Sequence, residues 1–222
     1  CIDLIQFLKI YGGKIRMNSN DQLDLFENKN HISPLQQNLE IEYIRDCFNK
    51  DESDALFESL KKNIEWKQDV IKMFGESHPI PRLTAWYGDE KKTYTYSGIT
   101  MNPLPWTKEL IEVKSKLEVC SKIKFNSVLL NFYRSGSDSV SWHSDDEKEL
   151  GEEPIIGSIS FGGIRRFRLR NKKDKKQIHT YELKHGSLLL MKGKTQKYWE
   201  HEIPKTKKNV SSRINLTFRY II

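Results

Sequence analysis

The segment Arg213-Ile214-Asn215-Leu216-Thr217-Phe218-Arg219 decides the fold. Its polar and apolar residues alternate, and a β-strand sends alternate side chains to opposite faces of a sheet. We therefore expect a strand with one apolar face and one face that carries two arginines. Two interpretations of these arginines stay open. They are solvated on a wet outer face of the sheet, or they hold an anion inside the fold.

Further short strands are expected upstream of this segment, and helices before them. Helical spacing of Leu56, Leu60 and Ile64 predicts a helix within residues 42–65, beginning at Tyr43-Ile44. A second helix should follow Leu104-Pro105-Trp106, with an apolar face formed by Leu110, Ile111, Val113 and Leu117. The strands are predicted at 128–133, 155–161, 166–170, 180–183, 187–191 and 213–222. Helices followed by many short strands favour an α+β fold with a jelly-roll core.

Length and composition indicate one globular domain with an extension. The chain has 222 residues, 37% hydrophobic and 30% charged, with a net charge of +7. No apolar run approaches the ~20 residues of a membrane-spanning helix, so we expect no membrane association. We also expect a monomer. The basic balance is compatible with a nucleic-acid partner but does not establish one. Cys1, Cys47 and Cys120 show no clustered spacing, which argues against a disulfide framework and favours a reducing compartment.

The N-terminal residues 1–40 are expected to be a mobile extension, and 41–222 the folded domain. The apolar stretch Ile2–Tyr11 lacks the basic start and small-residue cleavage site of a secretion signal. Two interpretations of residues 1–16 stay open, either a sequence that precedes a natural start at Met17 or a short helix. Residues 17–40 are polar and rich in Asn, Gln and Asp, which is typical of a flexible tail.

A candidate metal site comprises two histidines and one aspartate. His143 and Asp145 are two residues apart, on the same side of an extended chain. His-x-acidic triplets arise by chance, so a third ligand is needed, and His179, His185 and His201 are the downstream candidates. We favour His201, because His185 precedes a glycine at an expected turn and His179 adjoins a lysine-rich loop. Two neutral imidazoles and one carboxylate leave one face of an Fe(II) octahedron open, whereas structural zinc is usually closed by four ligands.

The arginines suggest what occupies the open face. A 2-oxo acid that binds iron through its keto end leaves a far carboxylate, for which arginine offers a planar bidentate donor. Arg213 and Arg219 are six residues apart, roughly 20 Å of extended strand, so both reach one small molecule only if their side chains lean together. Asn131 and Tyr133 share a strand face and could add neutral hydrogen bonds.

Together these motifs resemble the AlkB family of Fe(II)/2-oxoglutarate-dependent nucleic acid dealkylases, in its DNA-repair branch. The resemblance covers about residues 42–222 in the family's order. Its main elements are Asn131-x-Tyr133, His143-x-Asp145, His201 and the alternating segment 213–219. Segments 158–162 and 185–191 are also similar, and segments 81–88 and 94–98 look like the family's nucleotide-recognition lid.

The resemblance implies a double-stranded β-helix and a set of residue roles. The implied reaction is oxidative demethylation of 1-methyladenine or 3-methylcytosine in DNA, with Fe(II), 2-oxoglutarate and O2, and with formaldehyde as a product. The catalytic set would be His143, Asp145, His201 and Arg213, the first three of them as iron ligands. The 2-oxoglutarate site would comprise Asn131, Tyr133, Arg213, Asn215 and Arg219.

The target base must leave the base stack to reach a buried metal. By resemblance, Tyr96 and His143 would sandwich the base, Glu147 would accept a hydrogen bond from its exocyclic amine, and Tyr94 and Asp146 would stand nearby. Phe74, in Met73-Phe74-Gly75, matches the hairpin tip that wedges into duplex DNA in duplex-acting members. The alternatives are a half-buried hairpin face for the tyrosines, a solvated charge for Glu147 and a packed loop residue for Phe74.

Two basic groups and a tail motif complete the expected partners. Residues suited to phosphate contacts form a hairpin group, Arg165, Arg166, Arg168, Arg170, Lys172, Lys173, Lys175 and Lys176, and a second group, Lys205, Lys207 and Lys208. Gln22-Leu23-Asp24-Leu25-Phe26 resembles the peptide with which bacterial repair proteins bind the sliding clamp. The protein would be cytoplasmic in a bacterium and nuclear in a eukaryote. Alternative functions are RNA demethylation by the same fold and non-catalytic nucleic-acid binding.

Overall fold

The computed structural model describes residues 38–222 except 74–75, 91–93, 97–98 and 102, and it describes no side chains within 71–75 and 91–102. The chain divides into two units, Cys1–Pro34 and Leu35–Ile222, and the described residues all belong to the second unit. The expectations for Met17 and for the clamp-binding peptide 22–26 therefore lie outside the described residues. Within the described part of the chain, no helix is both long and apolar enough to cross a membrane.

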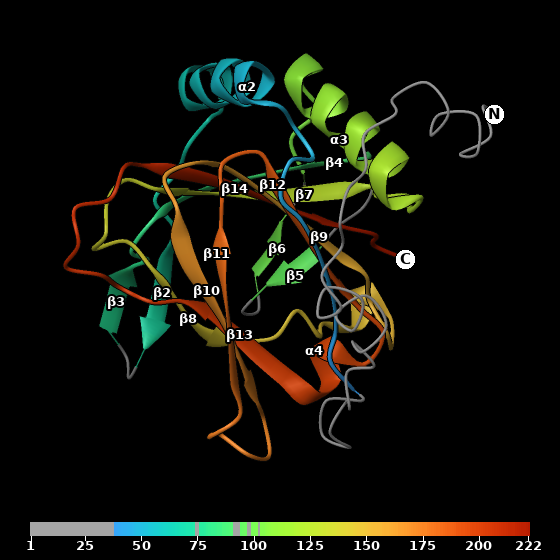
Figure 1. Cartoon of the computed structure of the whole chain (residues 1–222), viewed down its shortest axis with the longest axis vertical. Coiled ribbons are helices and arrows are strands. Elements are labelled where there is room, and N and C mark those ends of the chain that lie inside the picture. Colours follow the sequence, from blue (N-terminus) through green and yellow to red (C-terminus); the bar gives the residue numbers. More distant parts are fainter. Residues whose placement is uncertain (1–37, 74–75, 91–93, 97–98, 102) are drawn as a thin grey trace, which may run out of the picture. The chain divides into compact units, whose positions relative to one another are not determined.

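Two antiparallel sheets form the core, as the jelly-roll prediction requires (Figure 1). The major sheet has the strand order β1-β12-β9-β14-β7-β4, and the minor sheet has the order β11-β10-β13-β8. The strands of the major sheet are β1 (Glu40–Ile44), β12 (Ser187–Lys192), β9 (Ile156–Gly162), β14 (Arg213–Arg219), β7 (Ser127–Tyr133) and β4 (Leu83–Gly88). Those of the minor sheet are β11 (Ile178–Leu183), β10 (Arg165–Asn171), β13 (Trp199–Ile203) and β8 (Val140–His143).

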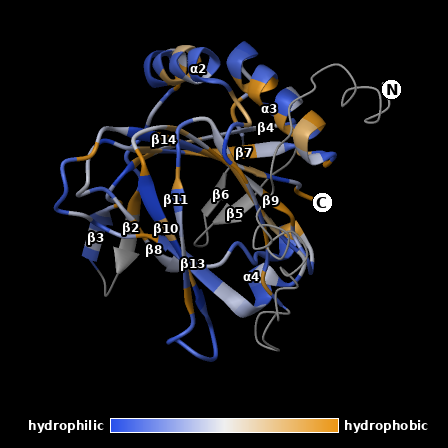
Figure 2. Ribbon diagram, viewed as in Figure 1, coloured by the Kyte–Doolittle hydropathy of each residue, from blue (hydrophilic) through white to orange (hydrophobic). Residues whose placement is uncertain are grey.

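Two helices cover the outer face of the major sheet. Helix α2 (Lys50–Asn63) begins with a capping box, in which the Asn49 side chain and the Glu52 side chain each accept a hydrogen bond from the other's backbone N–H. Helix α3 (Lys108–Ser121) is capped by Thr107, whose side-chain oxygen accepts a hydrogen bond from the Leu110 N–H. Their buried faces pack on the sheet through an apolar cluster that includes Leu56, Leu60, Leu110, Val113, Leu117, Leu130, Leu216 and Phe218. Their opposite faces are mostly hydrophilic (Figure 2).

The first predicted helix begins later than its pattern indicated. Tyr43 and Ile44 lie in strand β1, which pairs with β12, so the prediction that they start a helix is wrong. Tyr43 packs edge-on against Tyr181, and its hydroxyl donates a hydrogen bond to the Glu182 carbonyl. These contacts are distant in sequence, and they override the local pattern. Ile111 of α3 is likewise 51% exposed and does not belong to the buried face.

Strand β14 is buried on both faces. Ile214, Leu216 and Phe218 belong to the apolar cluster beneath the helices. Arg213, Asn215, Thr217 and Arg219 lie on the opposite face, inside the barrel, and all are buried. The solvated interpretation of the arginines is therefore wrong. The strand also ends at Arg219 rather than Ile222, because the Asn126 side chain takes over the backbone hydrogen bonds of Ile221.

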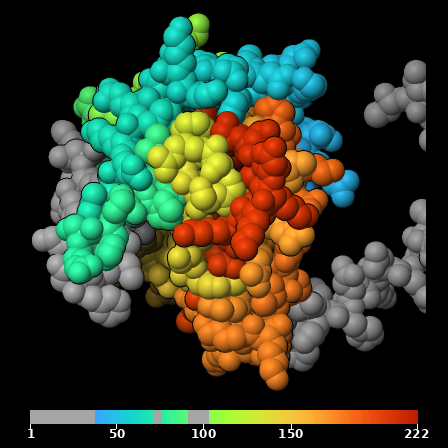
Figure 3. Space-filling model, turned by 90° about the vertical axis from the view of Figure 1, so that its left-hand side faces the viewer, coloured from blue at the N-terminus to red at the C-terminus, as the bar shows by residue number. Residues whose placement is uncertain are grey.

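Two smaller hairpins accompany the core. Strands β2 (Val70–Met73) and β3 (Glu76–Pro79) pair with each other, as do β5 (Tyr94–Tyr96) and β6 (Ile99–Met101). Residues 83–88, which resemble a lid segment, instead form core strand β4, so that assignment is wrong for them. A short helix α4 (Thr195–Tyr198) contacts strands β12 and β13, and a 3-10 turn (Lys148–Leu150) binds the Ile222 N–H through the Glu149 carbonyl. On one face of the domain, the β2–β3 hairpin, the turn at 134–139 and the segment 204–212 lie side by side (Figure 3).

Glu118 anchors the end of α3, and its charge should make part of the stability depend on pH. Its carboxylate accepts hydrogen bonds from Lys114 (2.8 Å), Lys124 (2.8 Å) and the backbone N–H of Phe125 (3.0 Å). Burial raises its pKa, but these donors outweigh burial and lower the pKa to about 2. Because the unfolded chain takes up the proton first, this stabilisation should be complete above about pH 5. It should shrink as the pH falls from ~4.5 towards 2.

Urea unfolding of wild type and Glu118→Gln at several pH values tests this expectation. The difference between their free energies of unfolding should be largest at pH 7 and smaller at pH 4. The matched control is Glu112→Gln, on the exposed side of the same helix. A Glu118→Gln difference that stays constant over this range would contradict the assignment.

Candidate metal centre and co-substrate site

The three predicted metal ligands meet at one point between the sheets. His143, at the end of β8, pairs directly with His201 of β13, and their ring centroids are 4.2 Å apart. Asp145 follows β8, with its Oδ1 4.0 Å from His143 Nε2. One potential ligand atom from each residue lies within 4.8 Å of the others. The other two histidines lie elsewhere, since His179 packs on Trp199 and His185 binds Asp54 and the Gly162 N–H.

The lowered pKa values of His201 and Asp145 favour cation binding by this group. Burial is the main cause that lowers the pKa of His201 to about 3, so its imidazole is neutral at pH 7 and can offer a lone pair. Burial alone would raise the pKa of Asp145, but Arg219 and the two imidazoles lower it to about 2. His143 is only partly buried and leaves the group accessible from one side. The donor set therefore fits Fe(II), with one anionic and two neutral ligands.

Arg219 holds the aspartate from inside the barrel. Its Nη2 donates a hydrogen bond of 2.8 Å to Asp145 Oδ1, and both side chains are less than a tenth exposed. A buried ion pair needs this close geometry to offset the loss of hydration. Arg219 thereby fixes the orientation of the Asp145 carboxylate, and the Oδ1 that it binds is also the oxygen that lies 4.0 Å from His143 Nε2.

Arg213 lies towards the other end of the same strand and is only partly satisfied. It is 1% exposed, its Nη2 donates to Ser160 Oγ (2.8 Å), and its guanidinium lies 5.2 Å from the centroid of the Tyr133 ring. Among the described residues, its Nε and Nη1 have no hydrogen-bond partner. Burial lowers its pKa to about 10, so it remains charged at neutral pH. A buried cation with two vacant donors fits a carboxylate of a bound small molecule.

The two asparagines expected at this site differ in what they can still bind. The Oδ1 of Asn131 accepts a hydrogen bond of 2.7 Å from Arg82 Nε. Because arginine can only donate, this bond sets the orientation of the amide and leaves the Asn131 Nδ2 to act as a donor. Asn215 is already engaged, since its Nδ2 binds Ser158 Oγ and the Ile159 carbonyl, and its Oδ1 accepts from Thr217. Asn215 can therefore support the site only indirectly.

The residues expected at the base are partly described. Glu147 is half-buried, and its Oε2 is buried without a hydrogen-bond partner in the described part of the chain. Asp146 is exposed, forms a 3.0 Å ion pair with Lys172, and lines a 470 Å³ cavity with Gln196 and Glu152. Tyr94 and Tyr96 lie in strand β5, but their side chains are outside the described set, as is Phe74.

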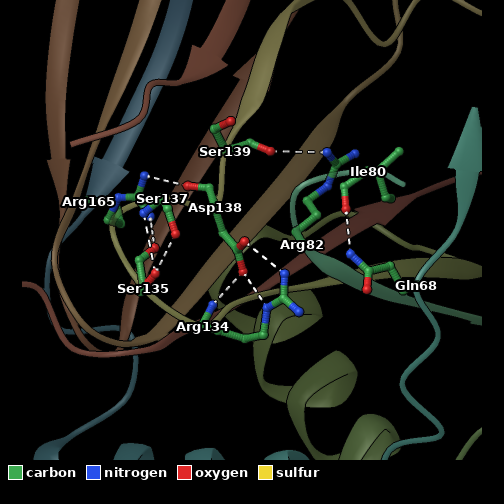
Figure 4. A network of polar contacts seen from close by, with 9 residues as sticks. All are labelled: Gln68, Ile80, Arg82, Arg134, Ser135, Ser137, Asp138, Ser139 and Arg165. Atoms are coloured by element: carbon green, nitrogen blue, oxygen red, sulfur yellow. Dashed lines mark hydrogen bonds and ion pairs between the residues drawn. The ribbon is translucent and has the colours of Figure 1, made fainter. Parts of the chain in front are cut away.

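Three arginines that sequence reasoning did not assign to this site fix the turn before β8 (Figure 4). Arg134 forms a two-pronged ion pair with Asp138 (2.7 and 2.9 Å), Arg165 donates to the Ser135, Asp138 and Pro204 carbonyls, and Arg82 donates to the Ser139 carbonyl. Arg165 is 3% exposed, so its prediction as a phosphate contact is wrong. Only the apolar spacing of β10, with Arg165, Phe167 and Leu169 on one face, could have indicated its burial.

Comparisons with known proteins agree with this geometry. Residues 40–219 match the model of the 2OG-Fe(II) oxygenase superfamily. The chain is 45% identical over 179 residues to alpha-ketoglutarate-dependent dioxygenase alkB homolog 3 of Mus musculus, covering 77% of this chain and 62% of that protein. It is 38% identical over 185 residues to DNA oxidative demethylase ALKBH2 of Homo sapiens, covering 79% and 71%. The chain thus spans about three-fifths of the length of the mouse relative.

The fold also resembles a solved structure. The structure of OsALKBH1 aligns with a TM-score of 0.57 and 17% identity, covering 81% of this chain and 97% of that one. At this identity the likeness concerns the fold alone.

A jelly-roll barrel that encloses two histidines, one aspartate and a buried arginine defines the class of Fe(II)- and 2-oxo-acid-dependent oxygenases. Within this class, the match to the superfamily model and the sequence identity to the two relatives show the family to which the chain belongs. The chain belongs to the 2OG-Fe(II) oxygenase superfamily and, inside it, to the AlkB family.

Metal titration should separate His201 from the other downstream histidines. His201→Ala removes one of three donors, so its affinity for Mn(II) should fall by more than the ~10–100-fold that is typical of losing an outer-shell partner. His179→Ala is the matched control and should bind Mn(II) like wild type. The measurement is the loss of the paramagnetic resonance signal of free Mn(II). Equal affinities of the two variants would contradict the ligand set.

Proposed function

We propose that this protein removes N-alkyl groups oxidatively from bases in DNA, in particular from 1-methyladenine and 3-methylcytosine, coupled to decarboxylation of 2-oxoglutarate. The observation that carries the proposal is the pairing of two features inside one barrel. His143, Asp145 and His201 can bind one cation. Arg213 is buried inside the barrel on strand β14 of the major sheet, with two vacant donors. The name of the human relative, DNA oxidative demethylase, favours DNA as the substrate.

Residue roles follow from the contacts. His143, Asp145 and His201 would hold Fe(II), and Arg219 would orient the carboxylate of Asp145. Arg213 would bind the far carboxylate of 2-oxoglutarate, with Tyr133 beneath its guanidinium and the Nδ2 of Asn131 as a further donor. Bound iron, 2-oxoglutarate and O2 supply the oxidation of the N-methyl carbon. The hydroxymethyl group that results on the base nitrogen is unstable and leaves as formaldehyde, restoring the base.

Base recognition is assigned to Asp146 and Glu147, which follow the metal ligand Asp145 in the loop after β8. The buried, unpaired Oε2 of Glu147 suits the exocyclic amine of adenine or cytosine, because a buried acceptor without a donor is costly. Asp146 would stand beside it, held by Lys172. The exposed edge of His143 would face the flipped base, with Tyr94 and Tyr96 contributed by the β5–β6 hairpin. Phe74, which lies between the β2 and β3 residues in the sequence, is proposed as the duplex wedge.

Formaldehyde release from oligonucleotides that carry 1-methyladenine or 3-methylcytosine tests the function. Wild type should release formaldehyde and succinate in equal amounts, and matched RNA oligonucleotides measure the alternative substrate. Arg213→Met should lose this activity while it keeps its affinity for Mn(II), and 2-oxoglutarate should no longer raise its melting temperature. Release from RNA but not DNA would favour the RNA demethylase. No release from either, with Fe(II) bound, would favour a binding module.

The exposed lysines of segment 204–212 are proposed to contact the phosphate backbone. Much of the basic hairpin is already neutralised, because Arg168 pairs with Glu202, Arg170 and Lys175 pair with Glu200, and Lys172 pairs with Asp146. Lys205, Lys207 and Lys208 are exposed and have no carboxylate partner in the described part. Their segment, 204–212, lies on the face that also carries the β2–β3 hairpin (Figure 3).

Replacing Lys205, Lys207 and Lys208 with Gln should reduce the salt dependence of DNA binding. The slope of log K against log salt concentration is negative, and each lost phosphate contact reduces its magnitude by ~0.9 for duplex and ~0.7 for single strands. The matched control replaces Lys61, Lys62 and Lys108, which are exposed on the helices, and removes the same charge. Fluorescence anisotropy at several salt concentrations gives the slopes. Equal slopes for the two triple variants would contradict a local phosphate contact.

A further inference from the structure

Gln196 is a buried polar residue beside the loop that follows β8 and carries the metal ligand Asp145. It belongs to the short helix α4 and is 1% exposed. Its Oε1 accepts a hydrogen bond of 3.0 Å from the backbone N–H of Asp145, and its Nε2 donates to Met191 Sδ at 3.4 Å. The two contacts agree on one orientation of the amide, because a backbone N–H can bind only the oxygen.

The loop that carries Asp145 depends on contacts from outside its own strand. Strand β8 ends at His143, so the Asp145 N–H lies beyond the strand and is satisfied by a side chain rather than by a neighbouring strand. Ser144 Oγ donates to the Trp199 carbonyl at the start of β13. Lys172 donates to both the Gln196 carbonyl (2.8 Å) and Asp146 Oδ2 (3.0 Å). Gln196 is therefore the link between α4 and the backbone of the aspartate itself.

We infer that Gln196 is a positioning residue for the metal carboxylate, an inference that rests on the metal centre of the proposed function. Arg219 holds the Asp145 carboxylate from inside the barrel, and Gln196 holds the backbone of the same residue from α4. With both ends fixed, Asp145 is presented to a cation in one orientation. Without the Gln196 acceptor, a buried N–H loses its partner, and the loop must move to recover one.

Mn(II) titration of the full chain, without co-substrate, tests this role. Gln196→Met keeps the size of the side chain and removes the acceptor, so the Kd for Mn(II) should rise about tenfold, the lower end of the range for outer-shell partners. Thr195→Val is the matched control, because Thr195 is equally buried in α4 but bonds to the Glu40 backbone instead. Its Kd should stay within twofold of wild type. The Asp145 amide should also exchange with deuterium faster in Gln196→Met than in Thr195→Val.

A milder variant covers the case in which Gln196→Met does not fold, as judged by circular dichroism. Met191→Leu preserves volume and removes only the acceptor that orients the Gln196 amide. It should raise the Kd about threefold. A Kd within twofold of wild type for folded Gln196→Met, or for Met191→Leu where the first variant fails, would overturn the inference. An equal rise in Thr195→Val would do so too. A wild-type chain that binds no Mn(II) would overturn the metal centre itself, and this inference with it.

Discussion

Two guanidinium groups buried inside a β-barrel are the constraint on which the rest of the structure depends. A buried cation is tolerated only when close partners replace its lost hydration. Arg219 finds such a partner in Asp145, at 2.8 Å. Arg213 has Ser160 and the face of Tyr133, and within the described residues its two other donor positions bind nothing. The first arginine is thus paired with Asp145, and we propose that the second binds the carboxylate of a small molecule. In that proposal, one strand links the cation site to the co-substrate site.

Such a polar interior requires the apolar core to lie elsewhere. The larger share of it is on the outer face of the major sheet, where α2 and α3 cover Ile214, Leu216 and Phe218 of the same strand. A smaller apolar cluster between the sheets includes Ile156, Leu169 and Trp199 and surrounds the polar group. The helices thus bury much of the apolar surface of the major sheet on its outer face. The inner face of the same sheet can therefore carry polar side chains. The alternating sequence of β14 serves both faces, because its apolar residues pack under the helices and its polar residues lie inside the barrel.

The sequence predicted local elements and the ligand set well, and it failed where the answer depended on distant contacts. The strand period, the α2 and α3 leucines and the His143-x-Asp145 spacing are visible in short windows. The third ligand had to be chosen among three distant histidines, and the structure brings His201 to the other two. The alternation in 213–219 could not say which face is wet, because that depends on helices about 100 or more residues away. Tyr43 in β1 and Arg165 beneath the 134–139 turn were misjudged for the same reason. Gln196 carries no motif, and only its hydrogen bond to Asp145 reveals it.

The arginines also show why net charge is a poor guide to where a polyanion would bind. The chain has a net charge of +7, yet many of its arginines are buried or paired within the fold. Arg82, Arg134 and Arg165 hold the turn before β8, and Arg168 and Arg170 lie against Trp142 while they pair with Glu202 and Glu200. Arginine suits these places because its flat, always-charged group can bind several carbonyls at once or stack on an aromatic ring. Lysine, a flexible and strongly hydrated cation, remains at the surface in 205–208. The surface available to a nucleic acid is therefore decided by which cations lack an internal partner, and the total charge does not reveal it.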